Sequence, residues 1–178
     1  MPPLWLDWRF YLVILGTFLL GCLSYQVRTP AAVDIGALGD RAYLWASPLS
    51  ADTGFNGDER LAAEGMNYRW TKRASWVRFP DMGWEGPFSL VLRIRGWRPE
   101  GEAPPPVEVR VNGVPAGRIQ PTGAWEEQRF DFPQYPGHSP DLEVLLESST
   151  FTPEGDQRTL GLQWDWARME PRPGGPYL

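Results

Sequence analysis

An uncharged apolar run near the N-terminus constrains this chain more than any other feature. It extends from Phe10 to Val27, and Arg9 and Arg28 bound it on either side. As a helix rising 1.5 Å per residue, the run is about 27 Å long, close to the roughly 30 Å hydrocarbon core of a bilayer. No later segment resembles it. We therefore expect one N-terminal transmembrane helix at residues 10–27, followed by a polar region long enough to fold by itself.

The apolar run is open to three interpretations. The first is a signal-anchor, a helix retained in the membrane. The second is a lipoprotein signal, because the sequence Leu-Leu-Gly-Cys ending at Cys22 is similar to a bacterial lipobox, and Cys22 is the single cysteine. The third is an export signal that is removed, since the most apolar part is as short as the core of such signals, or else a core helix that only resembles a membrane segment. Against lipidation, the start of the chain lacks the usual basic residues, and a lone cysteine in an apolar helix is often a small hydrophobe.

We expect three regions: a membrane anchor or signal segment at residues 1–28, an extracytoplasmic domain at 29–172 and a flexible tail at 173–178. The absence of cysteine after Cys22 excludes disulfides and thiolate metal sites in that domain. The chain's formal net charge of −5, with a single lysine and scattered arginines, excludes the basic stripe that nucleic-acid binding needs. The signal-like N-terminus and the tryptophan-rich composition favour a bacterial single-pass protein with its C-terminal domain outside the cytoplasm.

The pattern after residue 66 indicates short β-strands. Alternating apolar and polar residues predict strands at 67–71, 75–79, 88–97, 107–111, 126–132, 141–148 and 159–169, after two possible short strands at 33–36 and 42–45. Asn112-Gly113 predicts a type I′ hairpin turn leading into a return strand at 114–119, which Pro115 confines to an edge or bulge. The composition of residues 58–64 favours a short helix.

The alternation also assigns faces. In the strand at 88–97, Leu90, Leu92 and Ile94 point one way and Arg93 and Arg95 the other. In the last strand, a single buried face is expected to hold Leu160, Leu162, Trp164 and Trp166. Many short strands with regular turn signals predict a mainly β protein, an antiparallel β-sandwich.

The second half of the chain resembles galactose-binding-like jelly rolls, a group that includes many carbohydrate-binding modules. The matching features are the strand ending in Val111-Asn112-Gly113, then Trp125, the Phe130-to-Pro133 segment and the Leu/Val strand that follows. The resemblance implies a sandwich of two antiparallel sheets and a role in carbohydrate binding.

The wider arrangement is similar to the extracytoplasmic β-domain of bacterial multi-pass membrane proteins that resemble mannosyltransferase-type glycosyltransferases. The matching motifs are Asp34-Ile35-Gly36, Gly39-Asp40, Tyr68 to Thr71, Gly86-Pro87-Phe88, Thr150 to Pro153 and Leu160-Gly161-Leu162 with Asp165. The resemblance implies a multi-pass membrane partner, but the chain lacks the further helices and the acidic catalytic motif of such transferases. Transferase activity is therefore not carried over.

Candidate catalytic and metal-binding residues are scattered along the chain. His138, the single histidine, lies in a Pro/Gly loop that favours a solvated side chain over a catalytic triad. Carboxylates that glycoside hydrolysis would need are present at Glu126, Glu127, Asp131 and Asp165, but without a pairing pattern. The oxygen-rich stretch 52–59 is typical of calcium loops without matching the EF-hand spacing, so we expect a plain surface loop. The sequence predicts no cofactor, no metal site and no catalytic residue.

Tryptophans are the remaining signal for function. Trp97 is the last residue of the strand at 88–97 and lies on the same face as Arg95, and Trp84 precedes that strand in a glycine-flanked turn. Exposed aromatic rings stack on the apolar faces of sugars, and neighbouring arginines bind hydroxyl groups. The alternative is that the arginines merely cover the rings in cation–π pairs.

We therefore expect a membrane-anchored, non-catalytic module that binds carbohydrate, or acts as an accessory domain, through Trp84, Trp97 and Arg95. Two alternatives remain: the lumenal domain of a split glycosyltransferase-like membrane protein acting on lipid-linked sugars, and a structural surface protein.

Overall fold

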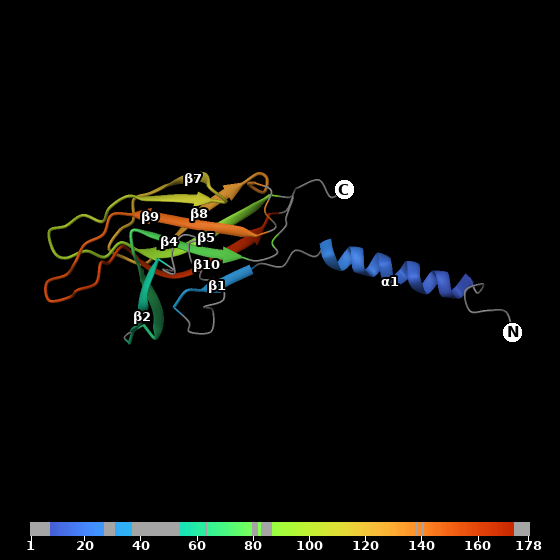
Figure 1. Ribbon diagram of the computed structural model, residues 1–178, viewed down its shortest axis with the longest axis horizontal. Coiled ribbons are helices and arrows are strands. Elements are labelled where there is room, and N and C mark those ends of the chain that lie inside the picture. The colour runs from blue at the N-terminus through green and yellow to red at the C-terminus, as the bar shows by residue number, and fades with distance from the viewer. Residues whose placement is uncertain are drawn as a thin grey trace.

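The computed structural model describes residues 8–26, 31–36, 54–62, 64–79, 82, 87–137, 139 and 141–172. These residues form one helix and ten strands (Figure 1). The elements are α1 (Trp8–Gln26), β1 (Ala31–Asp34), β2 (Phe55–Leu61), β3 (Met66–Thr71), β4 (Ala74–Phe79), β5 (Phe88–Arg95), β6 (Val107–Val111), β7 (Val114–Ile119), β8 (Glu126–Phe132), β9 (Leu142–Ser148) and β10 (Gln163–Pro171).

The helix α1 forms over the predicted apolar run and extends away from the strands (Figure 1). Its 19 residues correspond to about 28 Å, slightly less than the roughly 30 Å of a bilayer core. Within the described part of the chain, no helix is both long and apolar enough to cross a membrane. The predicted transmembrane helix at 10–27 is therefore not supported. The side chain of Cys22, the alternative lipidation site, lies outside the described residues.

The strands form two antiparallel sheets, which confirms the expected mainly β architecture. The larger sheet has the order β2-β3-β10-β5-β8, and β1 also pairs with β10; the smaller has the order β4-β9-β6-β7. One buried cluster joins them, with Leu90, Leu92 and Ile94 from the larger sheet and Val109 and Leu146 from the smaller. Burial of such side chains stabilises the packing of the two sheets, with a free-energy gain of about 25 cal/mol per Å² of apolar surface removed from water.

Two local predictions are confirmed in detail. In β5, Leu90, Leu92 and Ile94 are fully buried, whereas Arg93 and Arg95 are only partly buried on the opposite face. Residues 112 and 113 adopt positive φ angles of 49° and 76°, as a type I′ turn requires, and they connect the paired strands β6 and β7. The strand β7, which contains Pro115, lies at the edge of the smaller sheet.

The predicted helix at 58–64 is wrong, because residues 55–61 form β2. Tertiary contacts override the helical propensity of this segment. Phe55 enters the core beside Trp164, with ring centroids 5.7 Å apart, and Glu59 pairs with Tyr68 of β3. The possible strand at 42–45 lies outside the described residues.

The last strand also differs from expectation. Leu162 and Trp164 belong to the core, but Leu160 belongs to a second cluster, and the register of β10 shifts between Trp164 and Trp166. A bulge of this kind turns the following side chain to the other face of a sheet. Trp166 consequently pairs with Arg93 rather than with core residues.

Candidate ligand-binding face of the larger sheet

The outer face of the larger sheet, the side turned away from the core, carries the candidate site. Residues that pair directly in an antiparallel ladder share a face. Gln163 of β10 pairs with both Trp70 of β3 and Arg95 of β5, and Glu59 of β2 pairs with Tyr68 of β3. These side chains therefore share the outer face, although they come from four different strands.

Five rings form what we call the aromatic cluster at one end of this face: Tyr68, Trp70, Trp97, Trp125 and Phe151. Neighbouring centroids lie 5.7 to 6.3 Å apart, and most pairs meet edge to face. Pairs at such distances stabilise by about 0.5–1.5 kcal/mol beyond the effect of burial. The cluster is separate from the main core, so it covers the outer face rather than filling the sandwich.

Trp97 is the most exposed member of the aromatic cluster. Its side chain is 37% exposed and rests against Trp70 and Phe151, with centroids 6.0 Å from each. The preceding residue, Gly96, lets the backbone pass close to two prolines, because a Cβ at that position would lie 2.8 Å from Cβ of Pro104 and 2.9 Å from Cγ of Pro121. The predicted outward direction of Trp97 agrees with this packing, and its role in binding stays a prediction.

Two arginines flank Trp97 in different ways. The Nε of Arg95 donates to the carbonyl of Gly123 at 2.7 Å. Arg98 donates to the carbonyls of Trp97, Gly161 and Ser149, and its guanidinium lies 4.5 Å from the centroid of Phe151. Burial lowers the pKa of Arg98, and the nearby charge of Glu102 opposes that shift. Arg98 thus ties together the loops that support Trp97.

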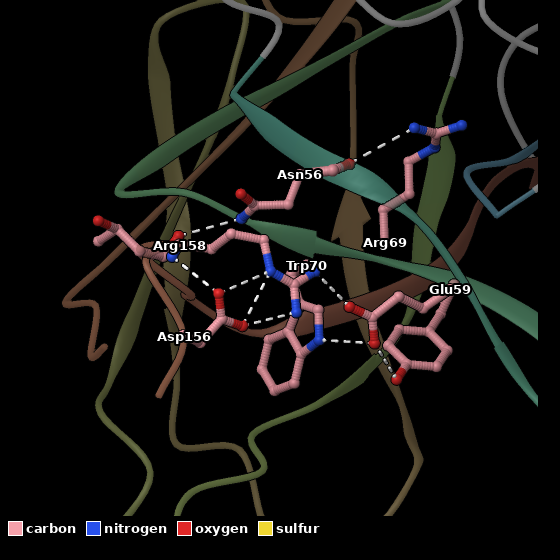
Figure 2. A network of polar contacts seen from close by, with 8 residues as sticks. Asn56, Glu59, Arg69, Trp70, Asp156 and Arg158 are labelled. Atoms are coloured by element: carbon pink, nitrogen blue, oxygen red, sulfur yellow. Dashed lines mark hydrogen bonds and ion pairs between the residues drawn. The ribbon is translucent and has the colours of Figure 1, made fainter. Parts of the chain in front are cut away.

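Glu59 connects three donors at the edge of the aromatic cluster (Figure 2). Its carboxylate accepts hydrogen bonds from the Tyr68 hydroxyl at 2.8 Å, from Nε1 of Trp70 at 3.2 Å and from Nη1 of Arg158 at 2.6 Å. Arg158 also pairs with Asp156 of its own loop at 2.7 Å. Figure 2 shows how these contacts fasten the loop that carries Arg158 to strand β2.

The same contacts raise the pKa values of Tyr68 and Arg158. Burial, followed by the hydrogen bond to Glu59 and its negative charge, raises the pKa of Tyr68 to about 12. The pKa of Arg158 is raised by its hydrogen bonds to Asp156 and then to Glu59. Tyr68 is therefore a neutral donor at ordinary pH, and its phenol holds the Glu59 carboxylate in place.

Polar groups lie buried at the centre of the outer face. Asp165 is 5% exposed, and its Oδ2 lies 3.1 Å from Nη1 of Arg93. Burial raises the pKa of Asp165 to about 6; Arg93 opposes this and Asp34 adds to it. Gln163 is 4% exposed, and among the described residues its Oε1 has no hydrogen-bond partner. Nε1 of Trp125 likewise finds none within the described parts of the chain.

The other half of the outer face carries a network of hydrogen-bonded and charged side chains. Arg129 donates to Glu170 at 3.0 Å and to the hydroxyl of Ser89 at 2.9 Å, and Ser89 donates to Asp131 at 2.6 Å. The hydrogen bond from Ser89 is the main cause that lowers the pKa of Asp131. These groups satisfy one another at the surface, so the aromatic half is the more suitable binding face.

Several predicted candidates fall elsewhere. Trp84 and His138 lie outside the described residues. Residues 54–59 of the oxygen-rich stretch are described, and residues 55–59 belong to strand β2 rather than to the expected surface loop. No group of three or more His, Cys, Asp or Glu side chains in the described residues could hold a metal ion. Of the four carboxylates considered for hydrolysis, Glu126 accepts from the amide of Thr122 and from Gln128, and Glu127 and Asp131 are exposed.

Sequence reasoning did not identify most of the aromatic cluster. The sequence predicts a binding role only for Trp97 and Arg95 of this region. Tyr68, Trp70, Trp125 and Phe151 lie in the motifs that carry the family resemblances, and Glu59 lies in the oxygen-rich stretch, without a predicted role in binding. One local signal was available in β3, where Tyr68 and Trp70 alternate with Arg69 and Thr71. Aromatic and polar faces of such a strand can both be buried, so the alternation alone does not show which side faces the core.

Comparisons with known proteins returned matches only among solved structures. No family model matches the chain, and no curated protein matches it. A family 35 carbohydrate-binding module from Clostridium thermocellum is 12% identical, with 79% of this chain and 98% of that one covered and a TM-score of 0.49. The C-terminal family 6 carbohydrate-binding module of a laminarinase from Zobellia galactanivorans is 13% identical, with coverages of 80% and 99% and a TM-score of 0.46.

A family 35 module from Cellvibrio japonicus is 16% identical, with coverages of 83% and 95% and a TM-score of 0.44. None of these three structures is a membrane glycosyltransferase-like protein. Identities and TM-scores this low leave the function to be inferred from this chain's own side chains.

Proposed function

We propose that the chain is a non-catalytic carbohydrate-binding module whose ligand stacks on Trp97. The observation that carries the proposal is the exposure of this ring: Trp97 is 37% exposed while Trp70 and Phe151 support it from behind. A large apolar side chain held rigidly at the surface offers binding area at little cost in conformational entropy. Pyranose rings present C–H faces that pack on aromatic rings.

Polar groups beside Trp97 fit the hydroxyl groups of a sugar. Arg95 and Gln163 lie directly opposite one another in the ladder between β5 and β10, next to the aromatic cluster. Amide and guanidinium groups supply the few oriented polar contacts that a mostly apolar site uses for specificity. The carboxylates nearest this point are engaged in structural contacts, since Asp165 pairs with Arg93 and Glu59 accepts three hydrogen bonds. A binding role therefore suits the face better than hydrolysis.

We also propose that the sandwich belongs to the galactose-binding-like jelly rolls and lies on the extracytoplasmic side of a membrane with which α1 associates. Support for the association comes from the exposed apolar side chains of α1, which are Phe10, Leu12, Val13, Ile14, Leu15, Phe18, Leu19 and Leu20. A helix that is apolar around its circumference favours apolar surroundings.

The aromatic cluster would then lie at the end of the sandwich far from the membrane. β1, which follows α1 in the chain, begins beside Met169, whereas Arg95 pairs with Gln163. Gln163 and Met169 lie toward opposite ends of β10, about 20 Å apart at 3.3 Å per residue. This placement favours a ligand that approaches from the solvent over one that is part of the membrane surface.

Glycan binding is tested by screening the full chain on a glycan array and titrating the hits against wild type and Trp97→Ala. We expect the substitution to weaken binding several-fold, the equivalent of about 0.5–1.5 kcal/mol of stacking. Trp76→Ala is the matched control, because Trp76 pairs with Leu145 in the other sheet. Absence of saturable binding to any glycan would refute the proposal, and equal effects of the two substitutions would move the site elsewhere.

Membrane association is tested by fractionating cells that produce the full chain or a chain beginning at Thr29. The full chain should sediment with membranes and resist a high-salt wash, whereas the shortened chain should not. Cys22→Ser separates the two routes of attachment, since only a lipoprotein would lose an acyl label. Recovery of the full chain in the soluble fraction would refute the association.

A further inference from the structure

Arg95 differs from the other arginines of the outer face in how its charge is compensated. Arg93 pairs with Asp165, Arg129 with Glu170 and Arg158 with Glu59. Arg98 is engaged by three backbone carbonyls. Among the described residues, Arg95 makes one hydrogen bond, from Nε to the carbonyl of Gly123, and no carboxylate pairs with it. The outer edge of its guanidinium, with both Nη atoms, has no hydrogen-bond or ion-pair partner among the described residues.

The hydrogen bond to Gly123 orients this guanidinium. It uses Nε, and it leaves two parallel N–H groups on the Nη side, the arrangement that binds a carboxylate or a sulfate through two hydrogen bonds. A lysine ammonium on its flexible stem would be mobile, but the Arg95 guanidinium is held by this hydrogen bond of 2.7 Å to the loop between β7 and β8. The chain thus holds a preorganised anion-binding group two residues before Trp97.

The surroundings of Arg95 suit a sugar rather than a free inorganic anion. Gln163 lies directly opposite Arg95 and directly opposite Trp70 on its other side. Its Oε1 is an acceptor with no partner among the described residues, although the residue is 4% exposed. Leaving a buried acceptor without a partner is unfavourable unless a donor such as a hydroxyl group reaches it. An anion alone offers no such donor, whereas a hydroxylated ring does.

We propose that the outer face recognises anionic carbohydrate, with the carboxylate or sulfate of the sugar on Arg95, a hydroxyl group toward Gln163 and the pyranose ring on Trp97. This inference rests on the proposed function and adds the chemical class of the ligand. It holds in spite of the net charge of −5, because Asp165 and Glu59 on this face are paired with Arg93 and Arg158, whereas no described carboxylate pairs with Arg95. Uronates and sulfated sugars share the required chemistry.

The experiment compares each anionic glycan with its uncharged form. The full chain is titrated calorimetrically with a galacturonate tetrasaccharide and its methyl ester, and with a sulfated galactan tetrasaccharide and its desulfated form. We expect one anionic member to bind at least tenfold more tightly than its neutral counterpart. Arg95→Gln should weaken that anionic ligand about ten- to a hundredfold and the neutral form much less, as expected for a charged hydrogen-bond pair.

Three variants make the result specific. Arg95→Lys keeps the charge without the fork and should fall between wild type and Arg95→Gln. Arg118→Gln is the control, because Arg118 is an exposed arginine of β7 that pairs with Glu108 in the other sheet. Trp97→Ala should weaken the anionic and neutral forms alike. Melting temperatures of all variants show whether a loss of binding reflects unfolding.

The outcomes separate the two proposals. Equal binding of the charged and neutral forms, or equal weakening of both by Arg95→Gln, would overturn the anionic ligand and leave carbohydrate binding intact. Absence of binding to all four tetrasaccharides, together with a negative glycan array, would overturn the proposed function itself. Whichever anionic glycan depends on Arg95 identifies the source of the charge, a uronate or a sulfate.

Discussion

Trp70 and Trp97 meet edge to face, with ring centroids 6.0 Å apart and planes inclined at 74°. Trp70 belongs to β3 and is nearly buried, whereas Trp97 follows β5 and remains exposed. The inner ring is itself fixed, because its Nε1 donates to Glu59. The exposed ring is therefore supported by a chain of contacts that reaches the edge of the sheet.

The first prediction concerns Glu59, which we regard as the residue that positions the aromatic cluster. Glu59→Ala removes the acceptor of three hydrogen bonds and leaves the Tyr68 hydroxyl and Nε1 of Trp70 without it. We expect a loss of about 1–3 kcal/mol in the free energy of unfolding, measured by urea denaturation. Glu154→Ala, an exposed residue, should change stability by less than about 0.5 kcal/mol. A stability of Glu59→Ala equal to that of wild type would show that water replaces these contacts.

The second prediction concerns the close packing at Gly96. Gly96→Ala places a Cβ within 3 Å of Pro104 and Pro121, so the strand end must shift. Overpacking of this kind costs about 1–3 kcal/mol. The emission spectrum of tryptophan should also change, because Trp97 is the next residue. Gly123→Ala is the control, since a Cβ there meets nothing within 4 Å; similar losses in both variants would argue against a steric cause.

The third prediction concerns pH. Because burial raises the pKa of Asp165 to about 6 from 3.8, the folded chain binds this proton more tightly than the unfolded chain. The resulting stabilisation is complete below about pH 4 and is lost as the pH rises through about 6. Its upper limit is about 3 kcal/mol, at 1.36 kcal/mol per pKa unit. Asp131 and Asp156, whose pKa values are lowered, act in the opposite direction.

Asp165→Asn isolates this contribution from the other carboxylates. Urea unfolding at pH 4, 5, 6 and 7 should show wild type losing stability relative to the variant over that range. A constant difference between the two proteins at all four values would mean that the pKa of Asp165 is the same in the folded and unfolded chains.

The fourth prediction concerns the hairpin between β6 and β7. Gly113→Val forces a β-branched residue to a φ of 76°, which costs about 1–3 kcal/mol. The melting temperature should fall by several degrees, since each kcal/mol corresponds to about 2–4 °C in a domain of this size. Gly57→Val is a suitable control, because a Cβ there meets nothing within 4 Å and its φ is not left-handed. Comparable melting temperatures for Gly113→Val and wild type would contradict the turn geometry.

The sequence by itself determined the strands whose signals are local. β5, β6 and β8 were predicted because side chains alternate with a period of two along a strand, and the turn at Asn112-Gly113 because few residues adopt positive φ. The same alternation placed Arg95 and Trp97 outward. These features depend on residues adjacent in the chain, so a pattern of ten residues is enough to reveal them.

Only the tertiary structure decided which residues share the candidate site. Glu59, Trp125 and Phe151 join Trp70 from segments far apart in the sequence, and no local pattern relates them. Tertiary pairing with β3 also made residues 55–61 a strand in spite of helical propensity, and the bulge in β10 turned Trp166 away from Trp164. Sheet register and bulges depend on which strands become neighbours, and that choice minimises exposed apolar surface and unpaired backbone groups over the whole domain.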